Sequence, residues 1–102
     1  MYARVLTFQF RFDPKVEAQM DRVSEENMPE LREQKGFIKL YELMDRENGR
    51  GIQLHLWESE ADLEAYLDSP TYHKLQGRAM AVLKDTDSAL GKIEHYEVAR
   101  QS

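Results

Sequence analysis

Two side chains that can take part in binding or catalysis, His55 and Trp57, are two residues apart in the chain. Leu54 and Leu56 alternate with them, which is the period of a β-strand with two different faces, so His55 and Trp57 share one face. An imidazole titrates near neutrality when nothing perturbs it, and an indole can stack on a flat ring. The pair therefore indicates a site that binds and deprotonates a phenolic ligand. The competing and more frequent interpretation is core packing of the indole beside a histidine with satisfied hydrogen bonds.

Further candidates lie on the helices that the sequence predicts after Trp57. His73 is just off the apolar stripe of its helix and would look into a pocket between helix and sheet, although an exposed or capping histidine is the more frequent case. Tyr41, Tyr66 and Tyr72 would supply hydroxyl groups that orient a ligand. Tyrosines in such places more often pack their rings and find a hydrogen bond at a rim.

Several other kinds of chemistry lack the residues that they need. The chain has no cysteine, so disulfides, a thiolate nucleophile and cysteine metal ligands are excluded. The three histidines form no metal-ligand motif, and His55 and His95 are expected about 9–10 Å apart on strands separated by a third. Gly49-Arg50-Gly51 is a hairpin tip and no phosphate-binding loop. We therefore predict a protein without metal, flavin or nicotinamide.

Charge and hydropathy limit the partners. The net charge is −5 and no basic run of five residues occurs, which argues against nucleic acid. The apolar runs are only a few residues long, and Arg4 and Arg11 bracket the first of them, so we expect no membrane contact and a cytoplasmic location.

The elements that must position these residues follow the order strand, helix, strand, strand, helix, strand. We predict strands over 2–12, 37–44, 52–57 and 93–100, and helices that begin at Asp13-Pro14, Ser59 and Ser69-Pro70. The first helix should break near Met28 and Pro29. Asn48-Gly49, within 46–51, is the strongest hairpin signal in the chain.

Two successive βαβ-like halves predict a single α+β domain over residues 1–102 with a ferredoxin-like βαββαβ fold. In its antiparallel sheet the last strand lies beside the first, followed by the third and the second. The helices cover one face, and the other face keeps aliphatic and aromatic residues that a monomer would expose. We therefore expect a homodimer in which two sheets close face to face.

The lone Trp57 at a strand end, the Ser59 cap that follows it and the break Ser69-Pro70 before His73 together resemble the antibiotic-biosynthesis-monooxygenase (ABM) family. The resemblance covers nearly the whole chain and implies a dimeric α+β barrel. It also implies cofactor-free oxygenation of a small electron-rich phenol or hydroquinone. In that reaction His55 is the first choice for the base, with His73 second, and Trp57 and Tyr66 would clamp the ring. Tyr72, His73 and Arg4 would orient the ligand or stabilise its charge.

The haem-degrading branch of that family can be tested by position. It uses an asparagine on the first strand, a tryptophan in the middle helix and a histidine in the next one. Here the helix positions hold Tyr66 and Gln76, and the only asparagines are Asn27 and Asn48, so the haem interpretation is rejected. A non-catalytic ligand-binding or stress-associated protein of the same fold, and an isomerase that acts without oxygen, remain as alternatives.

Overall fold

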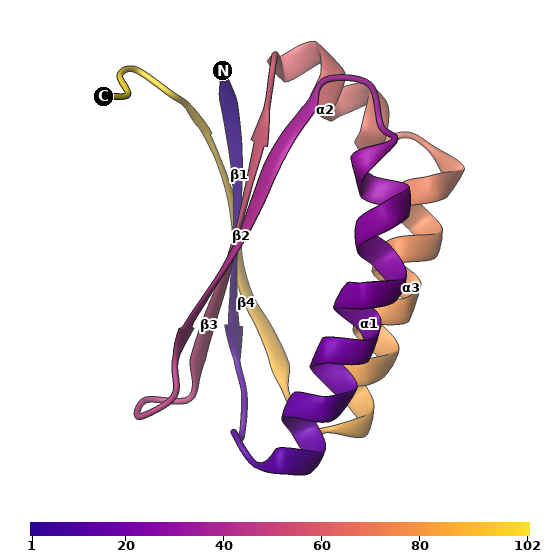
Figure 1. Cartoon of the computed structure of the whole chain (residues 1–102), viewed down its shortest axis with the longest axis vertical. Coiled ribbons are helices and arrows are strands. Elements are labelled where there is room, and N and C mark those ends of the chain that lie inside the picture. The colour runs from indigo at the N-terminus through magenta and orange to yellow at the C-terminus, as the bar shows by residue number, and fades with distance from the viewer.

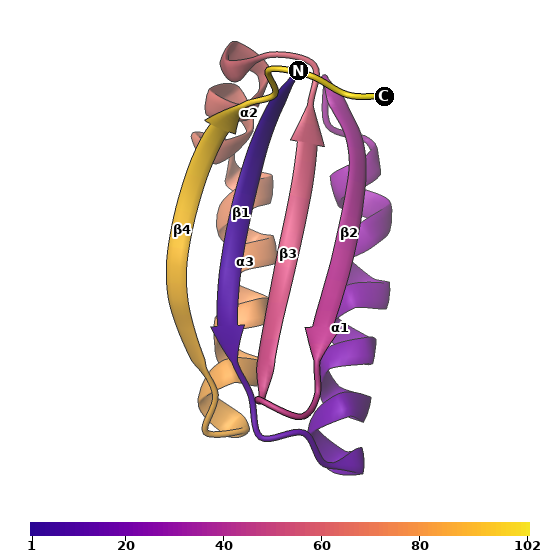
Figure 2. The same cartoon turned by 90° about the vertical axis from the view of Figure 1, so that its left-hand side faces the viewer.

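A four-stranded antiparallel sheet carries all three helices on one face, as Figure 1 shows for the computed structural model, which describes all 102 residues. The strands are β1 (Tyr2–Gln9), β2 (Phe37–Asp45), β3 (Arg50–Trp57) and β4 (Ala89–Glu97). The helices are α1 (Pro14–Arg32), α2 (Glu60–Leu67) and α3 (Pro70–Asp85). The order in the sheet is β2-β3-β1-β4 (Figure 2). The predicted ferredoxin-like α+β fold and its strand order are confirmed.

The predicted helix starts are confirmed by their caps. The Asp13 carboxylate accepts a hydrogen bond from the Val16 N–H at 2.9 Å. The Ser59 and Ser69 hydroxyls each accept one from the N–H three residues later, at 3.1 Å in both cases. Such caps satisfy amide groups that the first helical turn leaves free, which is why each helix begins where it does.

The hairpin between β2 and β3 turns at Asn48-Gly49 as predicted. Gly49 has a φ of +63°, a left-handed conformation that glycine adopts without steric cost. The Asp45 carboxylate accepts a hydrogen bond from the Asn48 side chain at 2.8 Å, and this contact closes the turn.

Several boundaries differ from the sequence-based expectation. The helix does not break near Pro29, because α1 continues to Arg32 with Pro29 inside it. Proline has no N–H, so the Glu25 carbonyl has no helical donor at Pro29; both residues are exposed, and water can bond that carbonyl. Buried Leu31 holds the last turn of the helix in the core. β1 ends at Gln9 because the Phe10 amide bonds the hairpin carbonyl of Gly49 at 2.8 Å. β4 covers Ala89–Glu97 and not 93–100, because Ala89, Leu90 and Lys92 still pair with β1 and the pairing ends at Glu97, opposite Tyr2 at the start of β1.

The strand register arranges polar side chains in one row across the helix-covered face. Arg4 of β1 lies directly opposite His55 of β3 on one side and His95 of β4 on the other. Directly opposite residues in an antiparallel pair point to the same face. Arg4, Leu6 and Phe8, at alternate positions of β1, all line the space under the helices.

The tightest part of the core lies at the end of the sheet where β3 meets α2. Trp57 is fully buried there, in a cluster completed by Leu31, Leu63, Tyr66 and Leu75. The opposite face of the sheet has no helix over it and carries Tyr41, Leu43 and Tyr96, which are 44–50% exposed. No helix has the length and hydropathy needed to cross a membrane.

Candidate functional site

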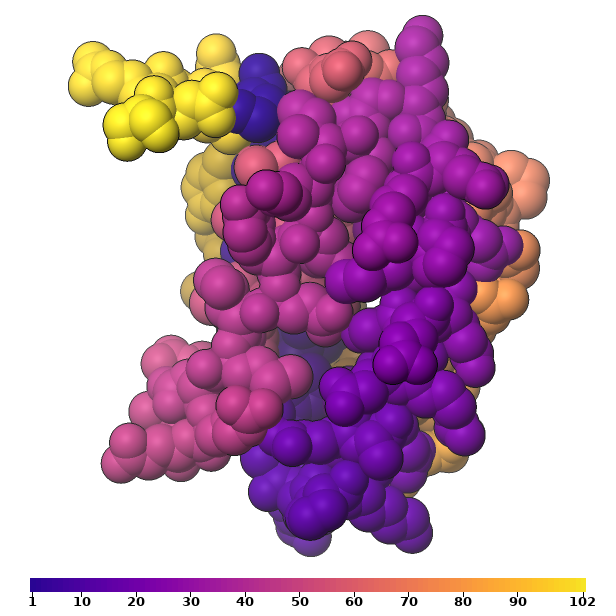
Figure 3. Space-filling model, viewed as in Figure 1, coloured from indigo at the N-terminus to yellow at the C-terminus, as the bar shows by residue number.

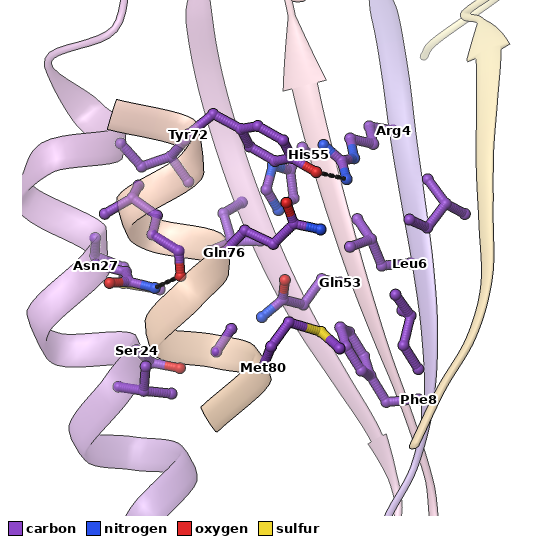
Figure 4. Close-up of a pocket in the computed structure, with 18 of the residues that line it drawn as sticks. Arg4, Leu6, Phe8, Ser24, Asn27, Gln53, His55, Tyr72, Gln76 and Met80 are labelled. Atoms are coloured by element: carbon purple, nitrogen blue, oxygen red, sulfur yellow. Dashed lines mark hydrogen bonds between the residues drawn. The ribbon is translucent and has the colours of Figure 1, made fainter. Parts of the chain in front are cut away.

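A cavity of about 100 Å³ lies between the sheet and the helices α1 and α3, on the hairpin side of the Trp57 cluster (Figure 4). Strand residues form one wall and helix residues form the other. Apolar side chains make up most of the lining, which comprises Arg4, Leu6, Phe8, Val23, Ser24, Asn27, Met28, Leu31, Leu40, Gln53, His55, Tyr66, Tyr72, Leu75, Gln76, Ala79, Met80, Leu83, Leu90 and Ile93. A mostly apolar cavity with a few convergent polar groups is typical of a small-molecule site.

His55 enters the cavity from β3 and is only 7% exposed. Neither of its ring nitrogens has a hydrogen-bond partner. Burial, helped by the positive charge of Arg4, lowers the pKa of His55 from 6.5 to about 3. The expectation that this imidazole titrates near neutrality is therefore wrong, because Leu54–Trp57 runs through the interior and the sequence pattern gives no measure of that desolvation.

Arg4 stands beside His55 and is 3% exposed. Its Nη2 donates a hydrogen bond to the Tyr72 hydroxyl at 3.2 Å, and its guanidinium carbon lies 5.1 Å from the centre of the Tyr72 ring. The Nε of Arg4 is buried without a partner, and Arg4 takes part in none of the four salt bridges. Sequence reasoning placed Arg4 and Tyr72 among the candidates, and the structure brings them together with His55.

Two amide side chains that sequence reasoning did not select also face the cavity. Gln53 comes from β3 and Gln76 from α3, and Figure 4 shows both side chains directed into the space between the layers. Gln53 precedes His55 by two residues and so shares its strand face, which is the signal that could have identified it. Asn27 of α1 also lines the cavity, but its Nδ2 is bonded to the Leu75 carbonyl at 3.1 Å.

The cavity continues toward the gap between α1 and β2 as a smaller hollow of about 50 Å³. Figure 3 shows the surface hollowed at this place, between α1 and the hairpin end of the sheet. Two polar contacts cross the gap: Ser24 donates to Glu42 at 3.1 Å, and Arg46 pairs with Glu17 at 2.6 Å. On the other side, Met80 of α3 and Ile93 of β4 line the cavity and are 43% and 44% exposed.

Two other candidates lie outside the cavity. Trp57 does not border it, because its ring is fully enclosed by Phe37 at 5.5 Å and Tyr66 at 5.0 Å between centroids. His73 does not look into it, because this position of α3 is exposed to solvent. Tyr66 does reach the cavity wall, and burial raises the pKa of its hydroxyl to about 12. No group of three or more histidine, aspartate or glutamate side chains is placed to hold a metal ion.

Comparison with known proteins gives matches over most of this chain. The family model described as antibiotic biosynthesis monooxygenase matches residues 3–78. None of the curated proteins matches the chain.

Solved structures share the fold over essentially the whole length. A candidate antibiotic biosynthesis monooxygenase from Deinococcus radiodurans superposes with a TM-score of 0.75 at 17% identity, covering 100% of this chain and 96% of the other. SnoaB, a cofactor-independent oxygenase from Streptomyces nogalater, gives 0.71 at 19% identity, with 99% and 94% covered. A conserved protein from Methanosarcina mazei Go1 gives 0.67 at 16% identity, with 94% and 91% covered.

Proposed function

Because the chain belongs to the antibiotic biosynthesis monooxygenase family, we propose that it is a cofactor-independent monooxygenase acting on a small electron-rich phenol or hydroquinone. The observation that carries the proposal is His55, a buried imidazole with two unpartnered ring nitrogens on the wall of a mostly apolar cavity. An unpaired buried polar atom costs stability, so an imidazole left unpartnered on a cavity wall supports a ligand in that cavity, and the family supports the reaction.

The first step in this mechanism is removal of the phenol proton by His55. The lowered pKa keeps the imidazole neutral at physiological pH and therefore free to accept a proton. Burial and the charge of Arg4 oppose protonation while the cavity holds no anion. Once the phenolate forms beside His55, its negative charge offsets both effects, so the proton is stabilised on His55 only together with the anion.

The second step is reduction of molecular oxygen by the phenolate itself. The ring donates electrons to O₂, and one oxygen atom forms a new carbon–oxygen bond at a ring carbon that carries hydrogen. Cleavage of the O–O bond releases the second oxygen as water, which takes up one hydrogen from the hydroxyl group and one from that carbon. The phenol thus becomes a quinone, with O₂ as the sole oxidant. An apolar cavity suits this chemistry because it keeps bulk water from the reactive intermediates.

The other candidate residues support the ring and the base. Tyr66 forms part of the cavity wall and is held by the fully buried Trp57, so the clamp consists of Tyr66 in contact with the ligand and Trp57 behind it. Tyr72 and Arg4 orient the ligand through their shared hydrogen bond next to His55. His73 is exposed and takes no part in this mechanism.

The uncovered face of the sheet supports a homodimer as the second part of the proposal. Tyr41, Leu43 and Tyr96 are the large exposed hydrophobic residues of this face, and half-buried Val5 and Leu54 lie between them. A chain of 102 residues buries only about 60–65% of its unfolded surface by itself, so a second copy packed on this face adds stabilising burial.

Oxygen uptake tests the proposal directly. A panel of hydroquinones and polyphenols is incubated with the purified protein in an oxygen-electrode cell, with the His55→Ala variant as the blank. We expect uptake in equal molar amount to quinone formed for at least one compound. Binding of these compounds with no uptake above the variant would instead favour a non-catalytic ligand-binding protein.

A further inference from the structure

The row His55–Arg4–His95 carries an inference about what the cavity binds. The three side chains lie in register on adjacent strands β3, β1 and β4 and face the helices. His95 was not among the site candidates, and at this position on the edge strand it is exposed. Arg4, in the centre of the row, has one hydrogen bond and a buried Nε with no partner.

A buried guanidinium without an anion is an unusual arrangement. An arginine side chain keeps its charge in proteins, and burial of a charge costs several kcal/mol unless an opposite charge and hydrogen bonds compensate for it. The contact with Tyr72 supplies one hydrogen bond and a ring face, while a guanidinium has five N–H donors. Arg4 is one of the residues that line the cavity, and its Nε is buried with no partner.

The groups around Arg4 leave a place for one anion. Facing it are His55 of β3, His95 of β4, Tyr72 of α3 and Tyr66 of α2, and none of these side chains is a carboxylate. The carboxylates of this region, Glu60, Glu64 and Glu97, lie near Tyr2, where they contribute to raising its pKa. Glu60 also acts on His95, where it opposes the lowering of the pKa by burial and by Arg4, so this carboxylate approaches the exposed end of the row and not Arg4 itself. The residues of α1 that line the cavity carry no charge.

We propose that Arg4, flanked by His55, His95 and Tyr72, forms an anion-binding subsite that holds the ionised oxygen of an aromatic ligand, so that the substrates are acidic hydroxyaromatic compounds bound as monoanions. The inference rests on the proposed function in taking this cavity as the ligand site. It narrows the substrate class, since a neutral arene of the same shape would leave the guanidinium unpaired. A planar guanidinium matches an anionic oxygen through two parallel hydrogen bonds, which a point charge such as lysine does not reproduce.

The probe for this subsite is 4-nitrophenol, whose phenolate absorbs visible light and whose neutral form does not. The protein is titrated into the probe under nitrogen, at the pH where the free probe is half ionised. We expect the pKa of the bound probe to fall by about one unit or more, so that about nine-tenths of it is phenolate. Benzoate should displace the probe at least about tenfold more effectively than nitrobenzene, the neutral compound of matching shape.

Variants locate the effect. Arg4→Met should abolish the shift, Arg4→Lys should retain part of it, and His95→Gln, at an exposed position, should leave the fold intact and reduce probe affinity. Arg11→Met, at an exposed arginine just after β1, is the matched control and should behave like the parent protein. Circular dichroism checks that each variant is folded.

Several results would overturn the subsite. The first is that the bound probe stays half ionised, so that its pKa is unchanged. The second is that nitrobenzene displaces the probe as well as benzoate does. The third is that neither 4-nitrophenolate nor benzoate binds at millimolar concentration. The wild-type comparison alone gives these results, so a misfolded Arg4 variant does not weaken the test. Because no oxygen is present, a positive shift together with no oxygen uptake from any phenol would retain the subsite and reject the oxygenase.

Discussion

Trp57 and Tyr66 stack their rings with centroids 5.0 Å apart and planes inclined by 26°, yet only Tyr66 reaches the cavity wall. In the proposed site the indole therefore supports the wall, and the Tyr66 ring is the surface that a ligand would contact. The tryptophan at the strand end thus packs behind the tyrosine of the next helix, and the tyrosine alone forms part of the cavity wall.

Replacement of His55 tests its role as the base. His55→Ala should lower turnover by about 100-fold or more while the protein stays folded, because a general base typically accelerates a reaction by at least that factor. Initial rates of oxygen uptake measure the effect with whichever hydroquinone the parent enzyme consumes. His73→Ala is the matched control, because this exposed histidine lies outside the cavity, and its rate should equal that of the parent. Equal loss in both variants would contradict the assignment.

The pH dependence of stability should also report on His55. Its pKa falls from 6.5 to about 3 on folding, so below pH 6.5 the unfolded chain binds a proton that the folded protein does not. The free energy of unfolding should therefore fall as the pH drops from about 6.5 toward 3, by up to about 1.4 kcal/mol per pH unit. Urea unfolding at several pH values measures this slope.

His55→Gln separates that slope from other titrations. The carboxylates with lowered pKa, Glu30 and Asp45, lose their stabilising effect only at more acidic pH, so the interval between pH 6.5 and 5 isolates the histidines. We expect a flatter profile for His55→Gln in this interval, with a smaller residual slope from His95, whose pKa is also lowered. A slope in His55→Gln equal to that of the parent protein would show that the imidazole is not desolvated.

Removal of the indole should weaken the fold and the site together. Trp57→Ala should reduce the free energy of unfolding by about 3–5 kcal/mol, because the ring is fully buried and its loss leaves a cavity. Binding of the aromatic probe should weaken as well, since Tyr66 loses its support. Trp57→Phe should recover part of both. Unchanged probe affinity in a folded Trp57→Ala variant would show that Tyr66 holds its place without the indole.

A charge on the uncovered face of the sheet tests the dimer. Sedimentation of the parent protein should show two chains, and Leu43→Lys should give a monomer because the new charge would be buried between the sheets. Ile93→Lys is a matched control, since Ile93 is similarly exposed but faces the helix side of the sheet, and it should remain dimeric. A parent protein that sediments as a monomer when dilute would remove the dimer from the proposal.

Local sequence signals predicted most of the fold because they act within a few residues. Asp13, Ser59 and Ser69 start helices through bonds to amides three positions on, and Gly49 permits its turn through its own backbone freedom. The helix break predicted at Pro29 was wrong, because the packing of the turn that follows outweighs the free-energy cost of a proline inside the helix. Tertiary burial overrides a weak local preference in such cases.

The site depended on information that no local pattern contains. The alternation of Leu54 to Trp57 placed His55 and Trp57 on one face, and both do lie there. Which of them borders a cavity was decided by helix α2, which covers Trp57 and leaves His55 beside an open space. The pairing of Arg4 with two histidines required the strand order and register, and the expected separation of His55 and His95 by one strand follows from the same order.

The two ends of the space under the helices differ in how their side chains are packed. At one end, the cluster of Leu31, Trp57, Leu63, Tyr66 and Leu75 is buried, and only its edge, formed by Leu31, Tyr66 and Leu75, borders the cavity. At the other, residues such as Val23, Ala79 and Met80 border empty volume, and a change in their size alters the shape of the cavity without removing contacts from that cluster. A substitution at Val23, Ala79 or Met80 should therefore change which molecules fit the cavity at little cost in the free energy of unfolding.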